Sequence, residues 1–110
     1  MAKYIVVHTY KKSPEEVWKV FSDMGPEMAR SMAAGETPAR CLKTWNPFPY
    51  GRTDRLVCLW EGDKPEQVEA SLTSLAEYVT SDIMQVDEID WAELAKPGGM
   101  SVPTQVPTRI

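Results

Sequence analysis

The chain has 110 residues, of which 43% are hydrophobic and 25% are charged, and its formal net charge is −4. This balance is typical of a single soluble globular domain. Lysine and arginine form no cluster, which argues against nucleic-acid binding, and no apolar run approaches the ~18 residues of a membrane span. A strand begins almost at the first residue and leaves no room for a signal peptide, so we expect a cytoplasmic protein whose two cysteines are reduced.

The first predicted element is a strand over residues 3–10. Ile5, Val6 and Val7 are β-branched, and tyrosines stand near both ends of the segment. Apolar side chains fall on both of its faces, which predicts a central strand covered on both sides.

A helix is predicted to begin at Ser13, with Pro14 at the first helical position and Glu16 completing a capping box. Gly25 and Pro26 should interrupt the hydrogen bonds of this helix, because proline has no N–H. The apolar stripe nevertheless continues, so we expect a kinked helix, or two helices in succession, ending near residue 35. The stripe is more typical of core residues than of a cofactor site, and its members are Val17, Val20, Phe21, Met24, Met28 and Met32.

Two apolar runs, residues 40–45 and 54–60, flank a turn-rich segment that contains two prolines. They predict a β-hairpin with a long tip. If the tip is centred between residues 49 and 50, Cys41 and Cys58 lie opposite each other, where the Cβ atoms of paired strands approach to about 4.5–5.5 Å. A disulfide is therefore conceivable, but a reducing compartment and the strain of cross-strand bridges favour free thiols.

A second helix is predicted after residue 63, because Asp63 and Glu66 have capping-box spacing. Its expected buried stripe consists of Val68, Leu72, Leu75 and Val79. Residues 82–88 alternate weakly and carry charges, which predicts a fourth strand at a sheet edge. A short helical turn is expected at residues 90–94, and the prolines within residues 97–110 predict an extended or flexible tail.

The predicted order βαββαβ indicates an α+β domain over residues 1–96 with a ferredoxin-like, four-stranded antiparallel sheet. In order and length the chain resembles the dimeric α/β-barrel superfamily. This superfamily includes muconolactone-isomerase-like enzymes, cofactor-free monooxygenases and functionally uncharacterised bacterial proteins, and the chain is most similar to the last group. The segments that carry the resemblance are Tyr4-Ile5-Val6-Val7-His8, Thr44-Trp45, Ser71-Leu72-Thr73-Ser74-Leu75 and Asp82-Ile83-Met84-Gln85-Val86.

The resemblance extends over residues 3–90 and implies a homodimer, in which two sheets pair face to face and enclose a pocket. It implies no catalytic residue, because no catalytic motif matches position by position. The residues themselves predict no cofactor, since the chain has no glycine-rich phosphate loop, nucleophile elbow or Walker motif. A lone histidine without a second ligand at suitable spacing also predicts no metal site.

Alternation along the strands sorts their side chains into two faces. Ile5, Val7 and Thr9 share one face of the first strand, and the larger, more mixed side chains share the other. We expect the aliphatic faces to pack against the helices, so that the mixed set lines the barrel pocket. The candidate ligand-binding residues are therefore His8, Tyr10, Lys43, Trp45, Cys58 and Trp60.

Each candidate also has an ordinary structural interpretation. His8 has a reference pKa of about 6.5, which suits proton transfer, but a strand histidine can simply be hydrogen-bonded. Trp45 and Trp60 can stack on a planar ligand, or they can fill the core or a dimer interface. Tyr10 and Lys43 can hold the oxygen or the acid group of a ligand, or they can be unremarkable strand-end residues.

Three functions remain open from the sequence. The first is a homodimeric protein that binds a small apolar or aromatic molecule in a sheet-lined pocket. The second is a cofactor-free isomerase or monooxygenase, in which His8 and Tyr10 are the acid/base candidates. The third is a structural or regulatory dimer whose aromatic residues belong to the interface. In all three the expected partner is a second copy of the chain, without nucleic acid or membrane.

Overall fold

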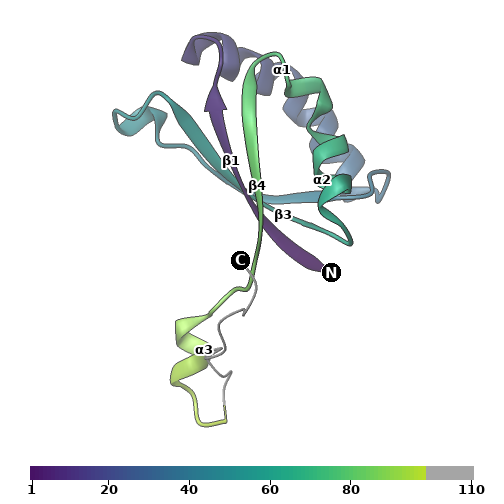
Figure 1. Ribbon diagram of the computed structural model, residues 1–110, viewed down its shortest axis with the longest axis vertical. Helices are drawn as coiled ribbons and strands as arrows, with labels where there is room; N and C mark the ends of the chain where they lie inside the picture. The colour runs from purple at the N-terminus through teal and green to yellow at the C-terminus, as the bar shows by residue number, and fades with distance from the viewer. Residues whose placement is uncertain (99–110) are drawn as a thin grey trace, which may run out of the picture.

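The computed structural model describes residues 1–98. Figure 1 shows a twisted sheet with two helices along one side and a short third helix beyond the last strand. The elements in chain order are β1 (Ala2–Tyr10), α1 (Pro14–Ala33), β2 (Arg40–Trp45), a 3₁₀ turn (Phe48–Tyr50), β3 (Arg55–Gly62), α2 (Pro65–Ser71), a second 3₁₀ turn (Thr73–Leu75), β4 (Val79–Val86) and α3 (Trp91–Ala95).

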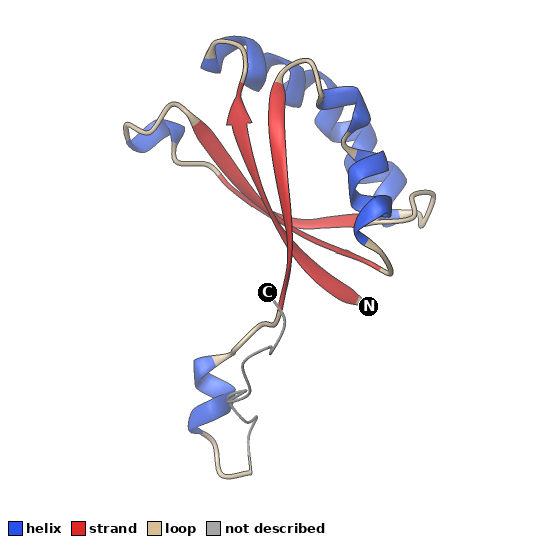
Figure 2. Ribbon diagram, viewed as in Figure 1, coloured by secondary structure: helices blue, strands red, loops and turns tan. Residues whose placement is uncertain are grey.

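The four strands form one antiparallel sheet in the order β2-β3-β1-β4. β1 is an inner strand and β4 an edge strand, as predicted. Both α1 and α2 lie on the same face of the sheet, and within residues 1–98 no element covers the opposite face (Figure 2). The α+β class and the order βαββαβ are therefore confirmed, and the architecture is compatible with a ferredoxin-like fold.

The start of α1 follows the predicted capping. The Oγ atom of Ser13 accepts a hydrogen bond from the Glu16 N–H at 3.3 Å and donates to the Glu16 carboxylate at 3.1 Å. The helix then continues through Pro26 to Ala33. The alternative of two successive helices is wrong, because the apolar stripe on both sides of the proline packs against the same sheet and outweighs one lost hydrogen bond.

The second helix is shorter than its apolar spacing predicted. Its N-cap is Lys64, and the Gln67 side chain accepts hydrogen bonds from the N–H groups of Asp63 and Lys64, at 2.8 and 3.3 Å. The expected pairing of Asp63 with Glu66 is therefore wrong by one position. Val79 opens β4 instead of closing the helix, because a residue buried at helical spacing can equally be the first buried residue of the next strand.

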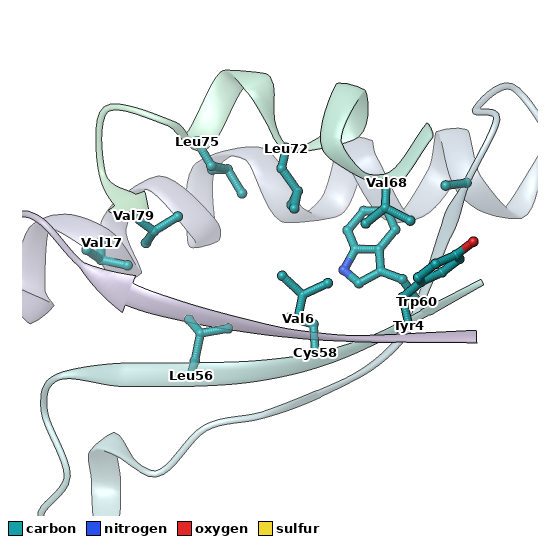
Figure 3. Close-up of a cluster of buried hydrophobic side chains, with 11 residues drawn as sticks. Tyr4, Val6, Val17, Leu56, Cys58, Trp60, Val68, Leu72, Leu75 and Val79 are labelled. Carbon is teal, nitrogen blue, oxygen red and sulfur yellow. The ribbon is translucent and has the colours of Figure 1, made fainter. Parts of the chain in front are cut away.

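The helix-covered face of the sheet carries the larger side chains. Figure 3 shows Val6, Leu56 and Trp60 directed from the sheet toward the helices, and all three are buried, as are Tyr4 and His8. The prediction that this set faces away from the helices was wrong. An aromatic side chain buries about 150–250 Å², so covering the aromatic set removes more apolar surface from water than covering valines does.

The opposite face, which we call the open sheet face, carries the aliphatic set. Ile5 pairs with Leu59 on one side and with Met84 on the other, and Val7 pairs with Val57. The strand residues Ile5, Val7, Val57 and Leu59 are only partly buried, and Met84 is 43% exposed. Soluble proteins rarely leave a contiguous apolar surface of this kind bare.

A β-bulge decides which way the β2 side chains point. The register with β3 shifts between Cys41 and Lys43, so that Cys41 opposes Trp60, Thr44 opposes Cys58 and Trp45 opposes Val57. The predicted direct pairing of the two cysteines is therefore wrong. The bulge also leaves Lys43 and Trp45 on the open sheet face, where Trp45 is 48% exposed.

The last described segment leaves the body of the domain. α3 lies beyond the end of β4, away from α1 and α2 (Figure 1), and Trp91 is 71% exposed. The predicted helical turn is confirmed, with Asp90 accepting hydrogen bonds from the N–H groups of Ala92 and Glu93. The predicted tail falls outside the described residues except for its first two. Within residues 1–98, no helix has the length and hydropathy to cross a bilayer.

Candidate functional site

The site begins with a cavity of about 230 Å³ between the sheet and α1. A hollow of about 560 Å³ adjoins it in the groove between α1 and α2, and the two share Met28, Met32 and Trp60. The groove therefore adjoins the cavity across these three side chains. The cavity wall is largely apolar, and its side chains include His8, Leu56, Cys58 and Trp60 from the sheet, Trp18, Phe21, Met28 and Met32 from α1, and Leu72 and Leu75 beyond it.

His8 supplies one polar group of the cavity. Its ring is 1% exposed, and Nδ1 lies 2.8 Å from the Ser81 Oγ, its opposite residue in the β1–β4 register. Burial lowers the pKa of His8 to about 4, so the imidazole is neutral at pH 7. Within residues 1–98 the contact with Ser81 is the one side-chain hydrogen bond that His8 makes, and His8 is among the residues that line the cavity.

Trp60 supplies a second polar group. Its side chain is 2% exposed, and within residues 1–98 its Nε1 makes no hydrogen bond of good geometry, although contact with Trp60 partly offsets the rise in the pKa of the Cys58 thiol. Figure 3 shows the indole nitrogen turned toward the space between Val6 and Leu72. Leaving a buried N–H unpaired costs about 1–3 kcal/mol, so this donor is a specific place for an acceptor atom.

Tyr10 contributes to the site by holding the side chain of Trp18. Its hydroxyl accepts a hydrogen bond from Trp18 Nε1 at 2.8 Å, and the Trp18 ring packs against Phe21 with centroids 5.3 Å apart. Burial is the main cause that raises the pKa of Tyr10, so the phenol stays protonated at neutral pH. Tyr10 therefore fixes the orientation of an aromatic wall and does not itself line the cavity.

The cavity and its groove lack a cationic lining. The groove carries two carboxylates, Asp23 and Glu27, which are ion-paired with Lys19 and Arg30 at 2.9 and 2.6 Å. No lysine or arginine is among the lining residues of either hollow in the described chain. An anion entering the cavity would therefore lose its hydration without gaining a counter-charge.

The predicted site residues divide into three groups. The cavity brings together His8, Cys58 and Trp60, Tyr10 lies behind its wall, and Lys43 and Trp45 lie across the sheet from it. Sequence reasoning missed Trp18 as a wall residue, although its place three residues before Phe21 puts both on one side of α1. The thiols of Cys41 and Cys58 are free.

Two further observations concern metal binding and similarity to known proteins. Residues 1–98 contain no group of three histidine, cysteine or acidic side chains that could hold a metal ion. The chain has no significant match among protein-family models, curated proteins or solved structures. The arrangement described above can enclose a small molecule in apolar walls and can offer it a donor from Trp60 and an imidazole nitrogen from His8.

Proposed function

We propose that this chain is a homodimeric binding protein for a small, uncharged aromatic or apolar compound, held between the sheet and α1. The observation that carries the proposal is the unpaired indole N–H of Trp60 beside an apolar cavity. Binding sites for small molecules combine apolar walls with a few convergent polar groups in this way. A carbonyl or phenolic oxygen on the ligand would accept the Trp60 hydrogen bond, with His8 Nε2 as a second polar contact.

The size of the cavity supports a ligand with one ring. An engineered apolar cavity of about 150 Å³ is known to take up benzene. A volume of about 230 Å³ accommodates such a ring with a short substituent. Larger compounds would extend into the adjoining groove between α1 and α2, past Met28 and Met32.

The open sheet face supports the dimer. Ile5, Val7, Val57 and Leu59 form an apolar surface that a second copy would cover with the same surface of its own. Two sheets paired in this way make a dimeric α/β barrel, as the resemblance to that superfamily implies. Because the cavity lies on the helix-covered face, ligand binding and dimerisation use opposite sides of the sheet.

The experiment compares three probes of matched shape: acetophenone, ethylbenzene and benzoate. Binding is followed by the indole N–H resonances in ¹H–¹⁵N spectra of the full chain. We expect acetophenone to shift the Trp60 resonance, ethylbenzene to bind more weakly because it has no acceptor, and benzoate to bind weakest because its charge is unpaired.

The matched variants are Trp60→Phe and Trp45→Phe. Trp60→Phe should remove most of the preference for acetophenone over ethylbenzene, a loss of roughly five- to tenfold, as expected for one hydrogen bond. Trp45→Phe, on the open sheet face, should leave that preference unchanged. If none of the three probes perturbs the Trp60 resonance at millimolar concentration, the binding proposal is wrong.

One observation favours a second candidate, a cofactor-free enzyme that moves a proton. The neutral His8 imidazole borders the cavity and can accept a proton there, although burial, which lowers its pKa to about 4, makes it a weak base. Tyr10 is a weaker candidate because its hydroxyl is engaged by Trp18. Incorporation of deuterium into the methyl group of acetophenone, lost in His8→Gln, would support this function; binding without exchange would support the binding protein.

A further inference from the structure

The thiols of both cysteines contact the hydroxyl group of Thr44. Thr44 Oγ1 lies 3.2 Å from Cys58 Sγ and 3.7 Å from Cys41 Sγ. The contact arises from the bulge in β2, which sets Thr44 opposite Cys58 and leaves Cys41 on the same face of the sheet. Two thiols on neighbouring strands are thus linked through one side chain.

The two thiols differ in access. Cys58 is buried, whereas Cys41 is half-buried and lines both the inner cavity and a hollow of about 240 Å³ between α1 and β2. A small reagent therefore reaches Cys41 first. β2 is an edge strand, and the Cys41 N–H donates a hydrogen bond to the Met32 sulfur at 3.1 Å.

The two thiols also differ in acidity. The interaction with the neighbouring Cys58 thiol is the main cause that lowers the pKa of Cys41 to about 7, and the Thr44 hydroxyl adds to it. The same contact with Cys41, together with burial, raises the pKa of Cys58. At neutral pH the pair therefore consists of a partly ionised, accessible thiol and a protonated, buried one, which is the combination found in reactive cysteine pairs.

We propose that Cys41 and Cys58 form a peroxide-sensitive dithiol, in which Cys41 is the attacked residue and Cys58 the resolving one. The Cys41 thiolate attacks one oxygen of hydrogen peroxide; the S–O bond forms, the O–O bond breaks, and the departing hydroxide takes a proton to become water. Cys58 sulfur then attacks the Cys41 sulfenic acid; the S–S bond forms, the S–O bond breaks, and a second water leaves with the Cys58 proton. Two thiols are oxidised, and one peroxide is reduced to two waters.

The test treats the reduced full chain with a small excess of hydrogen peroxide at pH 7, blocks the remaining thiols by alkylation and maps the peptides without reduction. We expect an intramolecular bridge between residues 41 and 58, which a thiol reductant reverses. Cys58→Ser should instead accumulate a sulfenic acid at Cys41, trapped by dimedone, and Cys41→Ser should leave Cys58 unoxidised because it is buried.

Thr44 provides a matched pair of variants. Thr44→Val removes the shared hydroxyl and should slow the oxidation, whereas Thr44→Ser retains the hydroxyl and should preserve the rate. Tryptophan fluorescence and circular dichroism establish that each variant is folded. The proposal is overturned if wild-type protein gives Cys41 sulfinic acid with Cys58 still free, a bridge between two chains, or no oxidation above that of Cys41→Ser. None of these outcomes depends on a ligand in the cavity.

Discussion

His8 and Ser81 face each other on β1 and β4, with 2.8 Å between the imidazole Nδ1 and the hydroxyl Oγ. This contact fixes the ring of a buried histidine that lines the cavity. Ser81→Ala leaves Nδ1 buried without a partner, so we expect the free energy of unfolding to fall by about 1–3 kcal/mol. Urea denaturation measures this loss, and Ser22→Ala, on the exposed side of α1, is the control that should show none of it. An equal effect of both substitutions would contradict the role of Ser81.

The stability of the protein should depend on pH through His8. Burial lowers its pKa to about 4, whereas the unfolded chain titrates near 6.5. Between these values the unfolded chain holds the proton and the folded chain does not, so the free energy of unfolding falls as the pH drops from about 6.5 to 4, by about 3 kcal/mol at most. His8 is the only histidine, so His8→Gln should flatten the dependence in this window. A ring resonance of His8 that titrates near 6.5 in the native protein would refute the prediction.

The open sheet face should determine the oligomeric state. Leu59→Lys places a charge at the centre of the apolar surface, so we expect it to convert a dimer into a monomer in sedimentation experiments at micromolar concentration. Tyr50→Lys, at the exposed hairpin tip, is the control that should remain dimeric. A wild-type protein that sediments as a monomer would rule out the proposed pairing.

The reactivity of Cys41 should reflect its acidity. With its pKa near 7, about half of the thiol is ionised at pH 7, and alkylation by iodoacetamide should be about threefold faster than for an unperturbed cysteine, because the larger thiolate fraction outweighs its lower nucleophilicity. The rate should rise with an inflection near pH 7. An inflection at 8.5 would mean that neither Cys58 nor Thr44 stabilises the thiolate.

Much of the fold was predictable from local chemistry. Ser13 and Pro14 marked the start of α1, and the proline-rich tip between two apolar runs marked the β2–β3 hairpin. Helix caps and turns both depend on residues that are close together in the sequence, so they can be recognised from the sequence alone.

Which face of the sheet packs against the helices was not predictable in the same way. Alternation correctly grouped Tyr4, Val6 and His8 together, but it carries no information on which group meets the helices. The choice depends on the total surface that both layers bury. The bulge after Cys41 was equally invisible, because it inserts one residue without a glycine or proline to mark it, and it moved Trp45 to the other face.

The proline in α1 has a kinetic consequence for whatever occupies the cavity. Pro26 cannot donate to the carbonyl of Ser22, and its neighbour Gly25 lines the cavity, so the helix is weakest at the point where it roofs the enclosed space. Hydrogen exchange in the middle of α1 should therefore be faster than in its flanking turns. The residence time of a bound molecule would then follow the frequency of this local opening, and a substitution such as Pro26→Ala would lengthen it without touching the ligand.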